Sequence, residues 1–289
     1  MTRIGLQAMM LKDRFAEVGA YEALKAAREV GYTAFEISQI PMTPHNVAGM
    51  RRAREELGVD IAALTAMLTS RPGSPFESLA TDLDKVIADA RALGADKIRI
   101  PMLSFDAVGS RDGVVAFARQ CEEIAKRLED VGISLAYHNH HIDFVTFDRS
   151  RQIDIILEES PRLEFELDVH WSYRGGVDPL EMLRRYGARV TLLHLRDYRV
   201  GHVPQSALAA AARGDIAEFY AGFIGVVQDS EVGEGSLDFR AIVDTAVAGG
   251  VQWMFVEQED LFGRDPLACA ETSLRNLTRL GYGDLCARP

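Results

Sequence analysis

Short runs of aliphatic and β-branched residues alternate along the chain with longer segments whose apolar residues recur every three or four positions. The short runs predict strands, and the longer segments predict amphipathic helices. Eight strands are expected, at Arg3–Ala8, Thr33–Ile37, Asp60–Ala66, Asp96–Pro101, Gly132–His138, Glu164–Val169, Val190–Leu195 and Val251–Glu257. Eight helices are expected between and after them, at Tyr21–Val30, Val47–Leu57, Phe76–Leu93, Val114–Val131, Ile153–Glu158, Pro179–Tyr186, Phe239–Ala248 and Pro266–Leu280.

Several expected helices are followed by glycine, as at Gly31, Gly58 and Gly94, and glycine is the preferred residue where a helix ends in a left-handed turn. Eight alternating strand and helix units favour a single closed (β/α)8 barrel over residues 1–289. An open dinucleotide-binding sheet is not supported, because the first turn lacks a G-x-G-x-x-G motif.

One connection is much longer than the others. The surplus, residues 200–237, lies between the seventh and eighth strands and contains an alanine-rich helical stretch and a glycine-rich turn. Loops that follow barrel strands lie on the active face. We therefore expect this insertion to be a lid or a partner-binding element, or else a decorated loop without a role.

Charge and composition exclude several classes of protein. The chain has 289 residues, with 32 Lys and Arg against 43 Asp and Glu, and its net charge is −11. It shows no basic cluster of the kind that binds nucleic acid, no apolar run long enough to span a membrane and no secretion signal. Its three cysteines are widely separated, which is typical of free thiols in a reducing cytoplasm. We expect a cytoplasmic protein with a small-molecule substrate.

Potential metal ligands stand at the ends of the last four expected strands. Five of the seven histidines lie there, on three strand ends. Carboxyl ends of barrel strands converge on one face, and residues two apart share a face of a strand. The candidate ligands are His138 or His140, Asp168, His194 and Glu257.

Mixed imidazole and carboxylate ligands predict a divalent cation. The absence of thiolates leaves its identity open, with manganese expected first and cobalt, magnesium, iron or zinc as alternatives. Such an ion acts as a Lewis acid beside a carbonyl and favours enolisation. Glu257 and whichever of His138 and His140 does not bind the metal are the candidate acid–base groups.

Other side chains are expected to contact the substrate. Glu36 and Arg99 belong to the second and fourth expected strands, and the others follow the sixth and seventh strands or lie in the insertion. For each of them, packing or an ion pair is the alternative role. The candidate substrate-binding residues are Glu36, Arg99, His170, Trp171, Arg196 and Glu234.

The motifs at 137–140, 167–171, 193–197, 233–239 and 256–259, taken in order, resemble the xylose isomerase-like barrel superfamily. They are most similar to its sugar phosphate isomerase/epimerase group, which includes inosose dehydratase and ketose 3-epimerases. The resemblance covers essentially the whole chain. It implies that the metal-binding Asp, His and final Glu are Asp168, His194 and Glu257, and that the substrate is a sugar or cyclitol.

The fifth strand departs from the epimerase pattern, because His138 stands where those enzymes have a glutamate. The Tyr-His-Asn-His sequence is more similar to the branch that acts on inososes and 3-keto-glycosides, which implies elimination of a substituent β to a ketone. Asp143 is a further carboxylate within reach of the metal. We therefore expect isomerisation, epimerisation or elimination of a sugar, keto-sugar or cyclitol.

Two other functions are open at this stage. A non-catalytic sugar-binding subunit, as a partner in a hetero-oligomeric glycoside-processing enzyme, would keep the barrel and lose a ligand. An abasic-site endonuclease would need more ligands on the first four strands, where Glu36 is the one candidate, and the acidic charge disfavours DNA. A homo-oligomer or a hetero-oligomer is compatible with the insertion.

Overall fold

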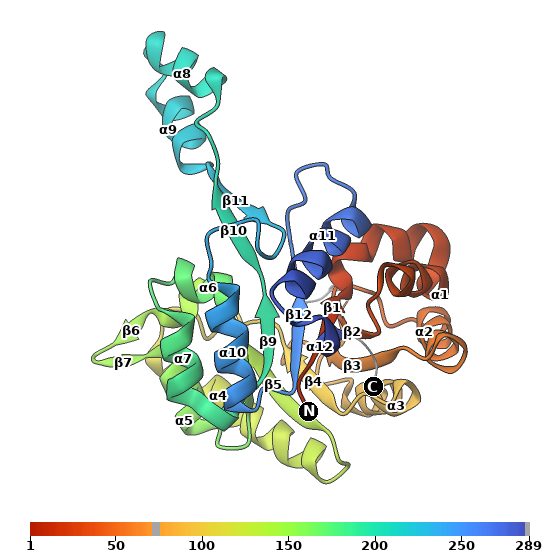
Figure 1. Cartoon of the computed structure of the whole chain (residues 1–289). Coiled ribbons are helices and arrows are strands. Elements are labelled where there is room, and N and C mark those ends of the chain that lie inside the picture. Colours follow the sequence, from red (N-terminus) through yellow and green to blue (C-terminus); the bar gives the residue numbers. More distant parts are fainter. Residues whose placement is uncertain (71–75, 287–289) are drawn as a thin grey trace.

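The centre of the chain is a closed barrel of eight parallel strands, seen in a computed structural model that describes residues 1–70 and 76–286 (Figure 1). Neighbouring strands pair in chain order, and the last strand closes the barrel against the first. The strands are β1 (Arg3–Gln7), β2 (Ala34–Ile37), β3 (Asp60–Thr65), β4 (Lys97–Ile100), β5 (Ser134–His138), β8 (Glu164–Asp168), β9 (Val190–Leu195) and β12 (Trp253–Val256). The (β/α)8 barrel that the sequence predicts is confirmed.

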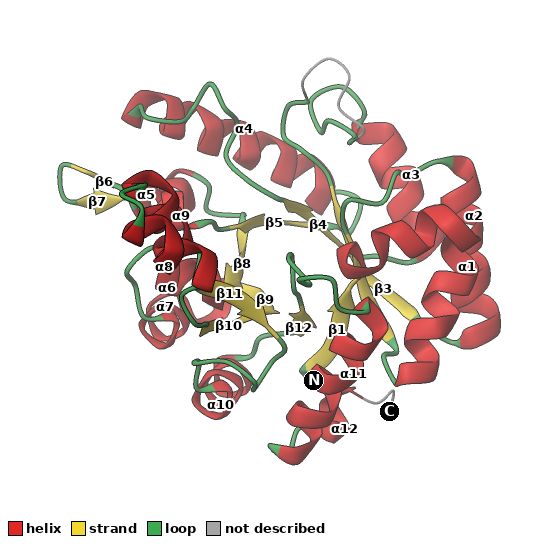
Figure 2. Ribbon diagram, turned by 90° about the horizontal axis from the view of Figure 1, so that it is seen from above, coloured by secondary structure: helices red, strands yellow, loops and turns green. Residues whose placement is uncertain are grey.

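Helices surround the strands, as the view down the barrel in Figure 2 shows. The helices outside the seventh connection are α1 (Lys12–Val30), α2 (Pro44–Leu57), α3 (Leu83–Leu93), α4 (Arg111–Glu129), α5 (Gln152–Glu159), α6 (Val169–Arg174), α7 (Pro179–Tyr186), α10 (Phe239–Gly249), α11 (Pro266–Arg279) and α12 (Gly283–Cys286). Short 3-10 helices are η1 (Ala8–Leu11), η2 (His141–Phe144) and η3 (Gly187–Arg189), and a small hairpin joins β6 (Thr146–Phe147) to β7 (Ser150–Arg151). No helix in the described ranges is long and apolar enough to cross a membrane.

The first and third helices begin furthest from the residues expected. The first extends back to Lys12, with a break at Gly19, whose φ of 82° is left-handed and suits glycine. The third begins at Leu83 rather than Phe76, because the Asp82 carboxylate accepts a hydrogen bond from the Ser78 N–H and closes a turn before the helix. The spacing of apolar residues alone predicts neither the break at Gly19 nor the turn before Leu83.

Alternation along the strands divides the barrel interior into layers. Leu192 and Phe255 are completely buried in a small apolar cluster, separate from the main core between strands and helices. Two residues further along the same strands stand His194 and Glu257, on the same face. The apolar layer thus closes the barrel below, and polar side chains fill its carboxyl end.

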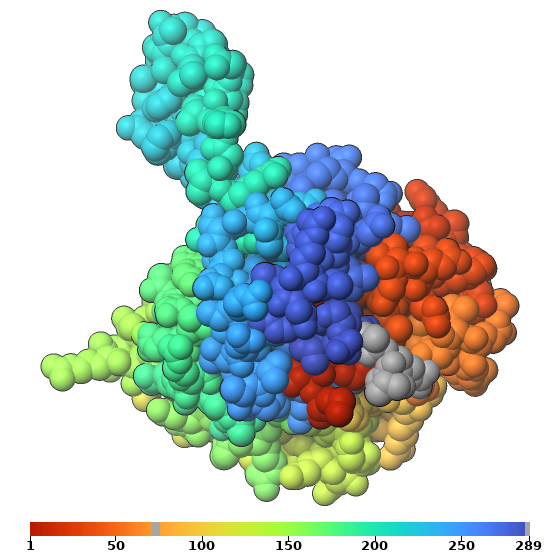
Figure 3. Space-filling model, viewed as in Figure 1, coloured from red at the N-terminus to blue at the C-terminus, as the bar shows by residue number. Residues whose placement is uncertain are grey.

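The seventh connection forms an arm, residues 197–230, that stands out from the barrel (Figures 1 and 3). Its stalk is an antiparallel ribbon in which Asp197 pairs with Ser230 and Val200 with Val227. The arm consists of β10 (Asp197–Val200), α8 (Gln205–Ala212), α9 (Ile216–Ile224) and β11 (Val227–Ser230). In the view down the barrel, α8 and α9 lie on the side of α5, α6 and α7 (Figure 2). A role for residues 200–237 as a lid or partner surface stays a prediction.

Candidate metal centre and its cavity

The carboxyl ends of β5, β8 and β9 bring three ligand-type side chains together. One ligand atom each from His138, Asp168 and His194 lies within 4.8 Å of the other two, and all three residues are buried. Strand register causes this proximity, because Asp168 and His194 are direct partners across β8 and β9. Glu257 follows β12 and places Oε2 2.7 Å from the Nδ1 of His194.

Glu166 lies beside one nitrogen of each imidazole in the cluster. The Nε2 of His194 lies 3.2 Å from Oε1 of Glu36 and 3.3 Å from Oε1 of Glu166, so its Nδ1 faces Asp168 and Glu257. The Nδ1 of His138 lies 3.2 Å from Oε2 of Glu166. Carboxylates placed in this way fix the tautomer and orientation of metal-binding histidines.

Asp168 is anchored through one oxygen and leaves the other without a hydrogen bond. Its Oδ1 accepts the Trp171 N–H at 2.7 Å at the start of α6, and its N–H donates to the Asn139 side chain. Its Oδ2 is buried, lies 3.7 Å from Nδ1 of His194, and accepts no hydrogen bond from the residues that the structure describes. A buried oxygen with no partner is uncommon and needs an explanation. Imidazole nitrogens and carboxylate oxygens are ligands of divalent cations, so the donor set fits such an ion.

Protonation in the cluster follows from burial and charge. Burial lowers the pKa of His138 well below its ordinary value. Burial also opposes a charge on His194, but Glu166, Glu257 and Glu36 raise its pKa well above the ordinary value. Burial raises the pKa of Glu257, yet His194 and Arg196 outweigh it and hold that pKa far below the ordinary value. The carboxylates around His194 therefore favour its protonated form.

Beneath the cluster, Arg99 joins two carboxylates in the barrel interior. Its Nε lies 2.9 Å from Oε1 of Glu36 and 3.2 Å from Oε2 of Glu166, and all three residues are buried. Burial raises the pKa of Glu166, but His194 and Arg99 lower it to about 2. Glu36 thus contacts His194 and Arg99, whereas Arg99 also lines the cavity described below.

The segment after β5 holds His140 at the cavity and Asp143 behind it. Asp143 is buried and accepts hydrogen bonds from Tyr137 Oη at 2.8 Å, Gln152 Nε2 at 2.6 Å and the His140 N–H at 2.7 Å. With these three donors the carboxylate fixes the His140 backbone, and it is not in the His138 cluster. Burial lowers the pKa of His140 to about 4, so its imidazole is neutral at pH 7.

Arg196 lies beside the cluster, between Trp171 and acidic side chains. Its guanidinium is 4.8 Å from the centre of the Trp171 ring, and its Nη1 is 3.5 Å from Oε1 of Glu257. Its Nη2 lies 3.0 Å from Asp229 and 2.9 Å from Glu259. This arginine therefore neutralises the carboxylates at the end of β12.

Of the six candidate substrate-binding residues, Arg99 lines the cavity. The others are not among its described lining residues: Glu36, His170, Trp171, Arg196 and Glu234. His170 is buried, with its ring edge-on to Trp171 at 5.1 Å and to Tyr198 at 5.4 Å between centroids. Glu234 is exposed and accepts a hydrogen bond from Asn276 Nδ2 at 2.9 Å. Their role in substrate binding stays a prediction.

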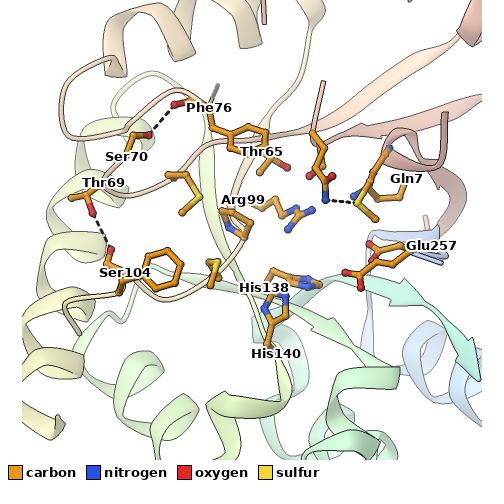
Figure 4. A pocket seen from close by; sticks show the side chains of 18 of the residues that line it. Gln7, Thr65, Thr69, Ser70, Phe76, Arg99, Ser104, His138, His140 and Glu257 are labelled. Carbon is orange, nitrogen blue, oxygen red and sulfur yellow. Dashed lines mark hydrogen bonds between the residues drawn. The ribbon is translucent and has the colours of Figure 1, made fainter. Parts of the chain in front are cut away.

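A cavity of about 810 Å³ opens above the cluster (Figure 4). His138, His140, Glu257, Glu259, Arg99 and Gln7 line one end of it. The segments that follow β3 and β4 line the other end, where Thr69, Ser70, Phe76 and Ser104 lie in Figure 4. Solvent and small molecules thus reach the histidines from this side.

Sequence reasoning missed Glu166. It has no histidine or motif beside it, but it stands two residues before Asp168 in the sequence Glu-Phe-Glu-Leu-Asp and therefore shares its face of the strand. The alternation of side chains along β8 is therefore the sequence feature that could have identified Glu166 as part of the site. No sequence pattern identifies the cavity-lining residues after β3 and β4. Loop conformations depend on tertiary contacts and show no periodic spacing of apolar residues.

Comparison with protein families matches residues 24–280 to the model described as "Xylose isomerase-like TIM barrel". The rhizopine catabolism protein MocC of Rhizobium meliloti is 25% identical over 280 residues, which are 90% of this chain and 81% of that protein. An inosose dehydratase of Lacticaseibacillus casei is 23% identical over 260 residues, covering 84% of this chain and 83% of that protein.

Solved structures share the same fold. A sugar phosphate isomerase/epimerase from Parabacteroides distasonis superposes with a TM-score of 0.70 at 20% identity, covering 100% of this chain and 95% of that one. The protein named IOLI, solved with a bound zinc atom, gives a TM-score of 0.65 at 14% identity, with coverage of 97% and 98%.

Proposed function

The chain belongs to the xylose isomerase-like TIM barrel family, and from this we propose that it enolises a sugar, keto-sugar or cyclitol with the help of a divalent metal ion. The observation that carries the proposal is the buried cluster of His138, Asp168 and His194, with Glu257 beside it and a cavity above. The names of the relatives, which include inosose dehydratase and sugar phosphate isomerase/epimerase, support an enzyme acting on such compounds.

His138, Asp168, His194 and Glu257 would hold the ion. A divalent ion at this place supplies a Lewis acid for a carbonyl or hydroxyl oxygen of the substrate and so acidifies the neighbouring C–H bond. Glu36 and Glu166 orient His194 from its other nitrogen, and Glu166 does the same for His138. Arg99 and Arg196 compensate the negative charge around the four ligands.

Proton transfer falls to His140 and Glu257, which both line the cavity. Burial keeps the His140 imidazole neutral at pH 7, so it accepts a proton from a substrate carbon or hydroxyl and returns it later in the cycle. Asp143 holds the His140 backbone through a 2.7 Å hydrogen bond and so positions the ring. Glu257 remains ionised and is the second candidate base.

Elimination is the form of the reaction that we favour. His138 stands at the end of β5, where a symmetrical epimerisation between two carboxylates would need a glutamate. One base is enough for elimination: it removes the proton next to a ketone, and the substituent on the β carbon leaves with its bonding electrons and takes up a proton. The inosose dehydratase relative is named for a reaction of this type.

The test is deuterium exchange from D2O into ketoses, inososes and 3-keto-glycosides, followed by mass spectrometry. We expect exchange at a carbon next to the ketone, loss of exchange after EDTA treatment, and at least a hundredfold slower exchange in His140→Gln and Asp168→Asn. His45→Gln is the matched control, because His45 is an exposed histidine in α2. Unchanged exchange in Asp168→Asn, or no exchange with any of these compounds after metal is added, would contradict the proposal.

A further inference from the structure

The tip of the arm carries an apolar surface that its own fold leaves exposed. None of the nine residues of α9 is buried. Four large apolar residues of this helix have about half or more of their surface exposed: Ile216 54%, Tyr220 54%, Phe223 51% and Ile224 71%. Phe219 lies beside them, and the ring centroids of Phe219, Tyr220 and Phe223 are 5.4 to 6.5 Å apart. We call these five residues the arm patch.

The arm patch is one continuous stripe along α9. Its residues recur at spacings of three and four, as on the side of an amphipathic helix that normally packs on a core. The other helix of the arm packs on a different side of α9, because a Cβ added to Gly222 would stand 2.5 Å from the Cβ of Ala207 in α8. The stripe therefore faces solvent rather than α8.

The pairing of α8 with α9 buries little apolar surface at the tip. The two helices have eight and nine residues, and helices shorter than about 12–15 residues are marginal in water without packing. The buried residues of α8 are Ala207 and Ala210, which are both small. The tip stands clear of the barrel in Figures 1 and 3. A second surface packed on the arm patch would supply the burial that the tip lacks.

The tip also differs from the rest of the protein in charge. Residues 200–226 contain one arginine, Arg213, and two acids, Asp215 and Glu218, which leaves −10 of the net charge of −11 on the rest of the chain. Arg213 pairs with Glu218. A membrane surface attracts helices rich in lysine and arginine, and this tip is not such a helix. Two copies of the chain repel each other through their acidic barrels, but not through their tips.

The arm patch has the size of one half of a dimer interface. A standard interface buries about 800 Å² on each partner, and somewhat more than half of this surface, roughly 450 Å², is apolar. A large apolar side chain contributes on the order of 200 Å² when it is fully buried. Four such side chains that are half exposed or more, with part of Phe219, thus offer roughly 450 Å².

We propose that the arm patch is the contact surface of a homodimer, in which α9 of one copy crosses α9 of a second copy. Twofold dimers are the commonest oligomers, and the same patch of both copies meets in their interface. Tyr220 is the middle residue of α9, so an antiparallel crossing at Tyr220 places Ile216 of each copy near Ile224 of the other. The ribbon of β10 and β11 keeps the two barrels apart. This dimer is independent of the proposed reaction.

Sedimentation velocity of the full chain measures the dimer. The variants are Tyr220→Ser and Ile224→Ser, and the control is Val247→Ser, which changes an exposed aliphatic residue of α10. We expect the unchanged protein and Val247→Ser to be dimers at micromolar concentrations. Each substitution removes an apolar side chain from both copies, so the Kd of the dimer should rise about a hundredfold in each arm variant. Circular dichroism shows whether the variants fold.

A cysteine cross-link tests whether the two arms meet. The native cysteines are buried, so a cysteine introduced at the surface is the accessible thiol. Ala217→Cys introduces a thiol beside Tyr220 and Ile224, and Ala248→Cys introduces one at an exposed position of α10 as the control. We expect a short bismaleimide to join two copies of Ala217→Cys and to leave Ala248→Cys as single chains.

Three results would overturn the proposal. The first is an unchanged protein that stays monomeric at these concentrations. The second is a dimer that persists in both serine variants and is not cross-linked in Ala217→Cys, because its contact then lies elsewhere. The third is a complex with a different protein in the absence of self-association. The cross-link decides between the outcomes if a serine variant does not fold.

Discussion

The turn that follows the arm is held by a single carboxylate, and this gives a sharp prediction for stability. The carboxylate of Asp197, at the start of β10, accepts hydrogen bonds from five backbone N–H groups. Its Oδ1 accepts from Tyr198 at 2.8 Å, Ser236 at 3.1 Å and Leu237 at 3.2 Å, and its Oδ2 accepts from Gly233 at 3.0 Å and Gly235 at 2.9 Å. Asp197 is completely buried and follows directly after Arg196.

Asp197→Asn preserves the shape and replaces one acceptor oxygen by an NH2 group. At least two backbone N–H groups, those that bond Oδ2, then face a donor instead of an acceptor. An unpaired buried donor costs about 1–3 kcal/mol. Because Gly233 and Gly235 are exposed and water replaces part of what they lose, we expect the lower half of the summed range, a loss of about 3 kcal/mol.

The assay is urea unfolding of the metal-free protein followed by circular dichroism. Asp215→Asn is the control: Asp215 caps α9 through one bond to the Glu218 N–H, and asparagine caps a helix as well as aspartate does. We expect little change there. A loss below about 1 kcal/mol in Asp197→Asn, or a similar loss in both variants, would refute the reasoning from five convergent donors.

Two further predictions concern buried titratable groups. Burial raises the pKa of Asp143 to about 6, above its ordinary 3.8, so the folded state binds more protons between these values and the stability from this group rises as pH falls. Between pH 7 and pH 5 the unchanged protein should therefore gain about 1 kcal/mol over Asp143→Asn in urea unfolding, whereas a pH-independent difference would contradict this. Burial raises the pKa of Cys121, Cys269 and Cys286, so a thiol reagent at pH 8 should modify none of them in the native protein and all three in urea; fast native reaction would count against their burial.

The barrel and the ends of its strands were predictable because both depend on local regularities. Strand alternation and the shared carboxyl face predict that His138, Asp168, His194 and Glu257 lie together, and the structure brings them to one place. The same regularity extends to Glu166, which stands two residues before the last residue of β8 and shares the face of Asp168.

Other features depend on contacts between distant segments. The start of α3 depends on a bond from Ser78 to Asp82, and the three donors around Asp143 turn a nearby carboxylate into a support for His140. The alanine-rich stretch predicted helical structure in the arm. It did not predict the antiparallel ribbon of β10 and β11 that holds α8 and α9 away from the barrel. One end of the cavity forms where the segments after β3 and β4 meet, and no short sequence pattern predicts that meeting.

The proposed function depends on a divalent metal site formed by four buried side chains, those of His138, Asp168, His194 and Glu257. Isothermal titration of Mn²⁺ and Zn²⁺ into EDTA-treated protein tests it most directly, with Asp168→Asn as the variant, His45→Gln as the control and circular dichroism to confirm folding. We expect one ion per chain in the unchanged protein and in His45→Gln, and binding at least about a hundredfold weaker in Asp168→Asn. Absence of binding in the unchanged protein, or equal affinity in folded Asp168→Asn, would contradict the proposed site.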